Sequence, residues 1–306
     1  MKKNKVAIHI PAIDNKSETK KGFLRASEVL SLEKLLRESP AIDFMGNIDF
    51  HKVRVENNKF VSEGVDLAET DLFFWFAPNM QKSIPLLSAL NNHTRVIKNP
   101  VSFATTADKF LAHSLLKSKG LPVAEFALIS CDDIDMMKSL LAEWKTLILK
   151  PRLGSFGRGI IKIDKLETLR DIAGMLRMEH QQKNIFIEKF YENDPEEWTS
   201  TTLINGKIIY GYRKKLEKFA DWKVYDPKAI GGGSFWVDPQ PVKALAEKAA
   251  ATLDTSIVGF DFIKTQEGYK IVDENNFPGF YPECFEKAEK EESRLIADLI
   301  ISSLSV

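Results

Sequence analysis

A glycine-rich segment directly follows an apolar run that ends at Lys150 and Pro151. Gly154, Gly157 and Gly159 fall within six residues, and this spacing lets a backbone bend tightly and turn its amide groups toward an anion. The order of the glycines is neither GxxxxGKS/T nor GxGxxG, and the next apolar run has the character of a strand. We therefore expect a strand–loop–strand flap over phosphate, to which Lys150 adds a point charge, with a plain hairpin connection as the alternative.

A second set of polar residues lies on two apolar runs joined by a short turn. Asp261 is on the first run, and Asp273 and Asn275 are on the second. If residues 266–268 form a three-residue loop with Gly268 in the left-handed region, Asp261 faces Asp273, and Asn275 points to the same side. Two carboxylates about 5 Å apart repel each other unless a cation lies between them. Two acids and an amide carbonyl suit Mg²⁺, and a solvent-facing acidic pair at a strand end is the alternative.

The first third of the chain alternates between strand and helix patterns. Apolar runs at residues 6–10, 72–76 and 95–97 predict strands, and the helical periodicity of residues 23–37 and 84–90 lies between them. This alternation predicts an α/β unit with a parallel sheet and helical crossovers. The pattern breaks around Asn99 and Pro100, and a new helix is expected with Thr105 or Thr106 as N-cap and a body over residues 109–119.

The rest of the chain has an α+β pattern. Strands are expected near residues 126–129, 146–150, 160–163 and 185–190, with helices between them. Asn205 and Gly206 separate two further strands and give a strong hairpin signal, and a charged helix is expected over about residues 284–304. We place domain boundaries so that residues 1–104, 105–188 and 189–306 form three units.

Composition excludes several classes of protein. The 306 residues carry 43 Lys and Arg and 43 Asp and Glu, so a uniform basic field for nucleic acid is absent. No apolar run approaches the roughly 18 residues that span a bilayer. Cys131 and Cys284 form no CxxC pair, which argues against a zinc cluster or disulfide framework and favours a reducing cytoplasm. The five histidines, His113 among them, show no ligand spacing, and none is assigned a role.

These landmarks together resemble the ATP-grasp superfamily of carboxylate–amine ligases, which includes D-alanine ligases, glutathione synthetases and ribosomal-protein glutamate ligases. The resemblance covers roughly residues 105–279. It implies an ATP-grasp fold, in which two α+β subdomains sandwich the nucleotide behind an N-terminal α/β domain. It also implies ATP and Mg²⁺, or Mn²⁺, as cofactors.

The resemblance implies roles for individual residues around the nucleotide. Lys109 matches the first nucleotide lysine, on the α-phosphate, and Lys150 matches the second, near the α-phosphate and adenine. Residues 154–159 match the flap over the β- and γ-phosphates, which brings in Gly154, Ser155, Phe156, Gly157 and Gly159. The adenine-reading hinge and the ribose site correspond to Glu188, Phe190, Tyr191 and Glu197.

The resemblance also implies roles for the residues around the phosphoryl group that is transferred. Arg213 matches the arginine that stabilises the transferred phosphoryl group and, with Lys150, is the expected catalytic residue. Asp261, Asp273 and Asn275 match the metal ligands. The family usually has Glu where this chain has Asp273, and the neighbouring Glu274 would compensate only if the strand register slipped.

The resemblance implies formation of an acyl phosphate from a carboxylate and ATP, followed by attack of an amine to give an amide. We expect small-molecule or peptide substrates that are anionic, because a basic segment with Lys214, Lys215 and Lys223 follows Arg213. No nucleic acid or membrane partner is expected, and a homodimer stays open. Residues 273–280 also resemble inositol trisphosphate kinases, so phosphorylation of a hydroxyl is one alternative and a non-catalytic nucleotide binder is another.

Overall fold

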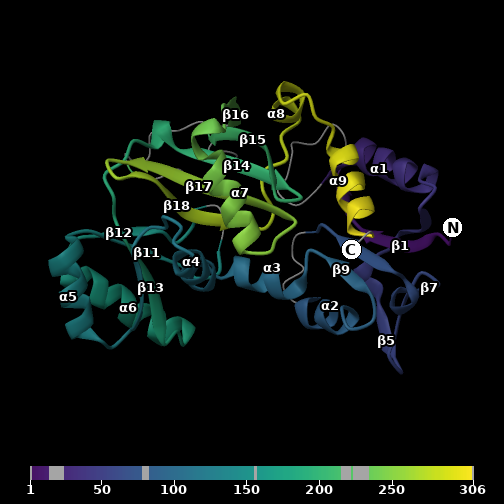
Figure 1. The fold of residues 1–306 in the computed structure, drawn as a ribbon. Helices are drawn as coiled ribbons and strands as arrows, with labels where there is room; N and C mark the ends of the chain where they lie inside the picture. The colour runs from purple at the N-terminus through teal and green to yellow at the C-terminus, as the bar shows by residue number, and fades with distance from the viewer. Residues whose placement is uncertain are drawn as a thin grey trace.

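The computed structural model describes residues 2–13, 24–77, 83–154, 157–214, 222 and 234–304. Figure 1 shows three groups of helices and strands, which are called layers below. The early strands and α1 lie at one end, β11–β13 with α5 and α6 lie at the other, and β14–β18 lie above the middle. Among the described residues, no helix combines the length and the apolar character needed to cross a membrane.

The N-terminal layer is built on a parallel sheet. Its strands are β1 (Asn4–His9), β4 (Ile42–Asn47), β8 (Leu72–Trp75) and β9 (Arg95–Ile97), in the order β4-β1-β8-β9. The helices of this layer are α1 (Ala26–Glu38) and α2 (Ile84–Leu90). The predicted parallel sheet is thus confirmed. Short strands that were not predicted are β2 (Ala12–Ile13), β3 (Leu24–Arg25), β5 (Arg54–Glu56), β6 (Lys59–Ser62) and β7 (Val65–Asp66).

The central layer carries the segment that was expected to form the flap. Four antiparallel strands lie in the order β10 (Phe126–Ser130), β13 (Asn184–Lys189), β11 (Leu147–Lys150) and β12 (Ile161–Ile163). Helices α5 (Ile134–Trp144) and α6 (Leu166–His180) bury their apolar residues in the same core as these strands. The glycine-rich segment therefore joins the antiparallel pair β11 and β12, as a strand–loop–strand flap requires.

The third layer is a five-stranded antiparallel sheet. Its order is β16 (Ser234–Val237), β15 (Lys207–Lys214), β14 (Thr199–Ile204), β17 (Ile257–Thr265) and β18 (Gly268–Asn275), and α7 (Lys243–Thr252) shares its core. Asn205 and Gly206 have φ of 53° and 68°, as the predicted tight hairpin requires. The three layers together confirm the predicted fold class.

Two predicted helices differ from the structure. One helix, α3 (Pro100–Ala107), precedes another, α4 (Lys109–Ser118), and the N-cap of α4 is Asp108, which accepts from the amides of Phe110 and Leu111. A threonine N-cap was wrong because Asp108 supplies the stronger acceptor directly before the helix.

The single C-terminal helix was also wrong. The chain forms α8 (Pro282–Lys287) and α9 (Glu292–Ser303), and Glu289 between them has φ of 54°. A left-handed residue interrupts the helical hydrogen bonds, so α9 can turn away from α8. It packs against α1 of the N-terminal layer, as Figure 1 shows.

Candidate nucleotide and metal site

The β17–β18 hairpin brings the predicted metal ligands together. Asp261 lies directly opposite Asp273, and Asn275 lies opposite Gly259. The predicted pairing is therefore confirmed, but the predicted three-residue loop is wrong. Thr265 pairs with Gly268 across a two-residue turn, and the extra residue is Val272, which forms a β-bulge between the turn and the acids.

A lysine neutralises each of the two aspartates. Lys109 Nζ lies 2.7 Å from Asp273 Oδ1, and Lys214 Nζ lies 2.8 Å from Asp261 Oδ2. Ser200 donates to the other oxygen of Asp261 at 2.6 Å. Burial lowers the pKa of both lysines, but their carboxylate partners outweigh it and leave both pKa values above the ordinary value. The aspartate pair thus sits between two ammonium groups, in accord with the repulsion expected of opposed carboxylates.

The donor chemistry of this hairpin fits a divalent cation. Two opposed carboxylates with the amide oxygen of Asn275 nearby are the hard oxygen donors that Mg²⁺ takes, with phosphate oxygens completing its shell. Asp261 is 7% exposed and the Asp273 side chain is 25% exposed, so Asp273 is the more open of the two to a bound ion. In the described part of the chain, three or more His, Cys, Asp or Glu side chains nowhere gather into a metal cluster. The candidate ligands are therefore the two acids and the amide of Asn275.

Lys150 closes the end of β11 over this hairpin. Its ammonium lies 2.6 Å from Glu188 Oε2 on β13 and donates to the carbonyl of Val272 at 2.8 Å. The β-bulge therefore places a carbonyl oxygen where Lys150 can use it. Lys150 and Glu188 are 7% and 2% exposed, so the predicted second lysine and the predicted adenine-side acid are held against each other.

A histidine that the sequence did not single out completes the buried charges. His113 Nε2 lies 3.4 Å from Glu188 Oε1, and its Nδ1 lies 3.1 Å from Glu274 Oε1. Burial lowers the pKa of His113, but the two glutamates raise it further, to about 9. The pKa of Glu188 is raised by burial and lowered by Lys150 and His113, and the net shift is downward. Glu274 therefore faces His113 and does not substitute for Asp273.

The helical spacing of two residues carries a signal for His113. Lys109 and His113 are four residues apart, which puts both on one face of α4. Both are buried, although they are polar. A lysine and a histidine on the apolar face of an amphipathic helix predict carboxylate partners, and the predicted role of Lys109 would have pointed to where those partners lie.

The described part of the flap is tied to α4. Lys109 Nζ donates to the carbonyl of Gly154 at 3.3 Å, and the Lys109 amide donates to the carbonyl of Arg152 at 3.1 Å. Gly159 has φ of 72°, and a Cβ there would lie 2.8 Å from Pro151 Cγ. This position therefore requires glycine. Ser155 and Phe156 of the predicted flap, and Lys215 and Lys223 of the predicted substrate segment, lie outside the described residues.

The predicted hinge is paired through its backbone. The amides of Lys189 and Phe190 donate to the carbonyls of Glu125 and Thr146 at 2.8 and 3.0 Å. Lys162 lies over the Phe190 ring at 3.8 Å. Tyr191 is buried, with Lys270 4.7 Å from its ring centroid. The amides of Lys189 and Phe190 are therefore already used in hydrogen bonds within the protein.

The remaining predicted residues lie nearer the surface. Glu197, in a short 3-10 turn (Pro195–Glu197), forms an ion pair with Lys264 at 2.8 Å, and both side chains are nearly half exposed. Arg213 on β15 donates through Nε to the carbonyl of Trp198 at 3.1 Å. Among the described residues, the guanidinium's two terminal nitrogens make no further hydrogen bond, so they can face an anion. Arg213 also lies one residue before Lys214, which binds Asp261.

The loop at residues 276–279, after the predicted metal ligands, is contacted from two elements. Lys98 of the N-terminal layer is buried, donates to the carbonyl of Asn276 and lies 4.2 Å above the Phe277 ring. The carbonyl of Gly279 accepts from the Tyr210 hydroxyl at 2.6 Å. A Cβ on Gly259, opposite Asn275, would lie 2.5 Å from the carbonyl of Thr201, so this strand needs glycine beside the metal residues. These contacts fix the direction in which β18 leaves the site.

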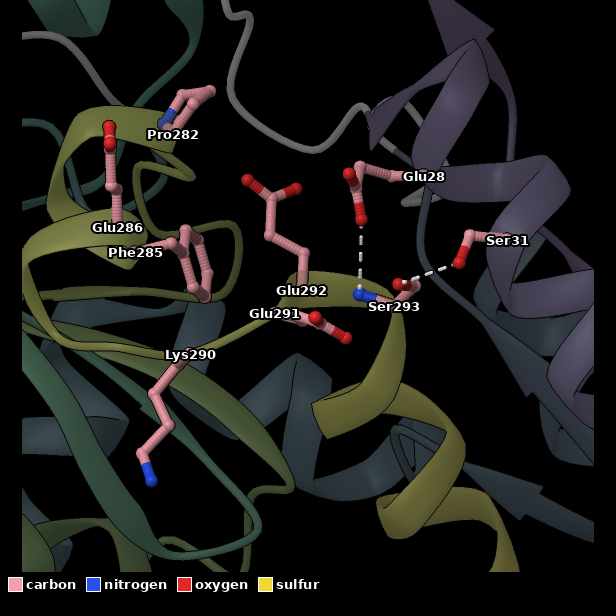
Figure 2. Close-up of a pocket in the computed structure, with 9 residues that line it drawn as sticks. All are labelled: Glu28, Ser31, Pro282, Phe285, Glu286, Lys290, Glu291, Glu292 and Ser293. Carbon is pink, nitrogen blue, oxygen red and sulfur yellow. Dashed lines mark hydrogen bonds between the residues drawn. The ribbon is translucent and has the colours of Figure 1, made fainter.

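A separate pocket of about 460 Å³ lies between α1, α8 and α9. Figure 2 shows Glu292 directed into it, between Pro282 and Glu28. Glu28 accepts from the Ser293 amide at 3.3 Å. Burial and Glu28 raise the pKa of Glu292 to about 7, against a smaller lowering by Arg25. None of the predicted nucleotide or metal residues lines this pocket.

Comparisons with known proteins identify the family of this chain. Residues 106–302 match the family model described as a RimK-like ATP-grasp domain. A probable alpha-L-glutamate ligase from Legionella pneumophila (strain Corby) is 25% identical over 195 residues, which is 63% of this chain and 62% of the relative. The alignment thus spans less than two thirds of that relative.

Solved structures share the fold over nearly the whole chain. The RimK domain ATP-grasp protein from Sphaerobacter thermophilus is similar, with a TM-score of 0.65 at 13% identity and coverage of 97% of this chain and 99% of that one. The ATP-grasp ligase PsnB, solved with a minimal precursor, Mg and ADP, has a TM-score of 0.62 at 15% identity, over 99% and 98% of the two chains. The ATP-grasp fold therefore extends through the N-terminal layer as well as the matched domain.

Proposed function

This chain belongs to the RimK-like ATP-grasp family, and from that membership we propose that it is an ATP-dependent ligase that joins a carboxylate to an amine. The observation that carries the proposal is the meeting, in one place, of Lys109 and Lys150 with the opposed pair Asp261 and Asp273. These residues come from α4, β11 and the β17–β18 hairpin, so the fold brings them together from three separate segments.

The reaction has two steps. A carboxylate oxygen attacks the γ-phosphorus of ATP, the bond from that phosphorus to the bridging oxygen breaks, and ADP and an acyl phosphate result. The amine nitrogen then attacks the acyl carbon, and the tetrahedral intermediate expels phosphate while the nitrogen loses a proton. Such chemistry depends mainly on positioning and on neutralising negative charge.

The residues of this chain provide that positioning. We assign Lys109 and Lys150 to the nucleotide phosphates, and Arg213 to the phosphoryl group in transfer. Asp261, Asp273 and Asn275 would hold Mg²⁺, which supplies charge neutralisation at the phosphate oxygens when it is bound. The flap between β11 and β12 would cover the acyl phosphate and exclude water, which would otherwise hydrolyse it.

The substrates follow from the relatives by analogy. The Legionella relative carries the name of a probable alpha-L-glutamate ligase, so we propose L-glutamate as the first amino-acid substrate to test. PsnB was also solved with the precursor peptide PsnA2, so we propose a peptide or protein carboxylate as the other class to test. Of the lysines predicted to bind an anionic acceptor, Lys214 is already paired with Asp261.

The experiment is mass spectrometry of products formed from Mg-ATP, L-glutamate and a host metabolite and peptide extract. The control is Lys150→Ala. The proposal predicts a new mass equal to two substrates minus water, together with ADP and phosphate, and no such mass with the variant. A substrate that gained only a phosphoryl group would replace the ligase proposal with a kinase, and absence of any ATP-dependent product would refute catalysis of both kinds.

A further inference from the structure

His113 is buried between two carboxylates that belong to different sheets. None of its surface is exposed, and its two ring nitrogens face Glu188 on β13 and Glu274 on β18. The rings of Phe126 and Phe186 lie 5.6 and 5.8 Å from the imidazole and nearly perpendicular to it. One side chain of α4 therefore touches acids from both sheets that enclose the proposed nucleotide site.

The charges around His113 balance only when the imidazole is protonated. Glu188, Glu274 and Asp273 supply three negative charges, and Lys150 and Lys109 supply two positive ones. A neutral imidazole has one ring nitrogen without hydrogen, which would turn a lone pair toward one of the two glutamates. An unbalanced buried carboxylate is costly, so the imidazolium is the form that this arrangement stabilises. The upward shift of its pKa, to about 9, agrees with this count.

The same helix face grips two successive residues of β18. Lys109 binds Asp273 and His113 binds Glu274, and the two cations are one helical turn apart. On its other side, His113 holds the oxygen of Glu188 that Lys150 does not use. His113 therefore restricts both the strand that carries Asp273 and the carboxylate that orients Lys150.

We propose that His113 is a positioning residue of the nucleotide site, which fixes Glu188 on Lys150 and fixes β18 against α4. The proposal rests on the proposed nucleotide binding for its effect on ATP, but the charge arrangement can be tested without it. Removing the imidazolium should release Glu188 from one partner and leave two buried acids with too few cations. Lys150 and Asp273 would then lose their fixed places, and Mg-ATP would bind more weakly.

The first test measures Mg-ATP affinity by calorimetry in the full chain. For His113→Gln we expect affinity to fall about tenfold, because two residues that contact the nucleotide or its metal become misplaced. In the double variant His113→Gln with Glu274→Gln, one negative charge is removed as well, and most of the affinity should return. His180→Gln, on the exposed end of α6, is the matched control and should bind Mg-ATP like the unmutated chain.

A merely structural histidine would predict a different pattern. Loss of stability without loss of affinity in the folded variant, or no recovery in the double variant, would overturn the proposal. If His113→Gln alone does not fold, the double variant carries the test, because recovery of a folded and ATP-binding chain is then the expected result. If the unmutated chain binds no Mg-ATP, the proposed function fails and the effect on ATP fails with it.

The second test needs no nucleotide, and it uses variants only to assign the signals. Nitrogen-15 NMR of the histidine rings in the unmutated chain should show both nitrogens of His113 protonated at pH 7.5, with His180→Gln and His113→Gln spectra to assign the signals. A neutral His113 ring at that pH would overturn the charge arrangement independently of any activity.

Discussion

The candidate nucleotide site around Lys150 and His113 and the pocket between α1, α8 and α9 differ in how their buried charged groups are paired. At the candidate nucleotide site, Lys150 and His113 both contact Glu188. Burial raises the pKa of this glutamate, but the two cations lower it further and leave it below the ordinary value. In the pocket, Glu292 is 7% exposed, and no hydrogen bond or ion pair joins its carboxylate to the described residues around it. Its pKa rises to about 7.

This difference shows where the fold depends on fixed ions. A buried pair keeps both groups charged and holds them at one distance, whereas an unpaired acid lowers its cost by taking up a proton. Mutations at the candidate nucleotide site should therefore reduce activity. Mutations in the pocket should instead change how stability depends on pH.

The largest effect on activity is expected from a mutation at the candidate nucleotide site. Lys150→Ala should lower kcat/KM for Mg-ATP by about 10³, because it removes a phosphate contact and leaves Glu188 with one partner fewer. Steady-state ADP release at varied ATP measures it. Lys145→Ala, an exposed lysine that donates to the carbonyl of Ala142, is the control and should behave like the unmutated chain. Equal losses in both variants would mean that Lys150 has no special place in the site.

A mutation of the proposed metal ligand Asp273, on β18, should give the next largest effect. Asp273→Asn should raise the Mg²⁺ concentration needed for half-maximal activity by about 10²-fold, because an amide is a weaker ligand than a carboxylate. It should also lower the free energy of unfolding by roughly 1–3 kcal/mol, since Lys109 loses its ion pair. Magnesium titration of activity and urea unfolding check the two parts. An unchanged magnesium requirement would argue that Asp273 is not a ligand.

The pocket should show a smaller effect that depends on pH. The pKa of Glu292 is raised from 4.5 to about 7, so the folded state holds a proton that the unfolded state has lost, and stability declines as pH rises through this window. Glu292→Gln should therefore raise the free energy of unfolding at pH 8, by at most about 3 kcal/mol, and change it little at pH 4.5.

The contribution of His113 at the candidate nucleotide site should be lost over a higher range of pH. The pKa of His113 is raised from 6.5 to about 9, so its contribution is complete below pH 6.5 and is lost as pH rises through 9. Urea unfolding from pH 4.5 to 9.5 separates the two, because Glu292→Gln should flatten only the lower part of the profile. A variant that flattened both parts would show that the two regions are not independent.

The smallest effect is expected at the surface. Glu197 pairs with Lys264 where both side chains are nearly half exposed, and such a pair adds little to stability. Glu197→Gln should leave Tm unchanged but raise KM for ATP a few-fold, since the carboxylate is predicted to hold the ribose hydroxyls. A KM that stays the same for ATP would remove Glu197 from the site, and 2′-deoxy-ATP would then be used as well by the variant as by the unmutated chain.

Much of the fold and part of the site could be predicted from local patterns. Alternating strands and helices indicated the parallel sheet, and Asn205 with Gly206 indicated a hairpin. The pairing of Asp261 with Asp273 was predicted from a three-residue loop, and it is confirmed because the bulge at Val272 makes up for the shorter two-residue turn.

Other features depend on contacts between distant segments, so no local pattern could give them. The raised pKa of His113 comes from Glu188 and Glu274, which follow it by many residues, and its spacing from Lys109 indicates only a shared helix face. The break before α9 has no glycine or proline to mark it. It is set by the packing of α9 on α1, which a sequence pattern in either helix does not reveal.

The β-bulge at Val272 has a consequence for how this site tolerates change. It lies between the hairpin turn and the two acids, and it takes up the one-residue difference between the two-residue turn and the pairing of Asp261 with Asp273. Because the carbonyl of Val272 is fixed by Lys150, the bulge is anchored from outside the hairpin. The turn at residues 266–267 should therefore tolerate a change of length while the acids keep their places, which makes this tip a natural position for inserting a label.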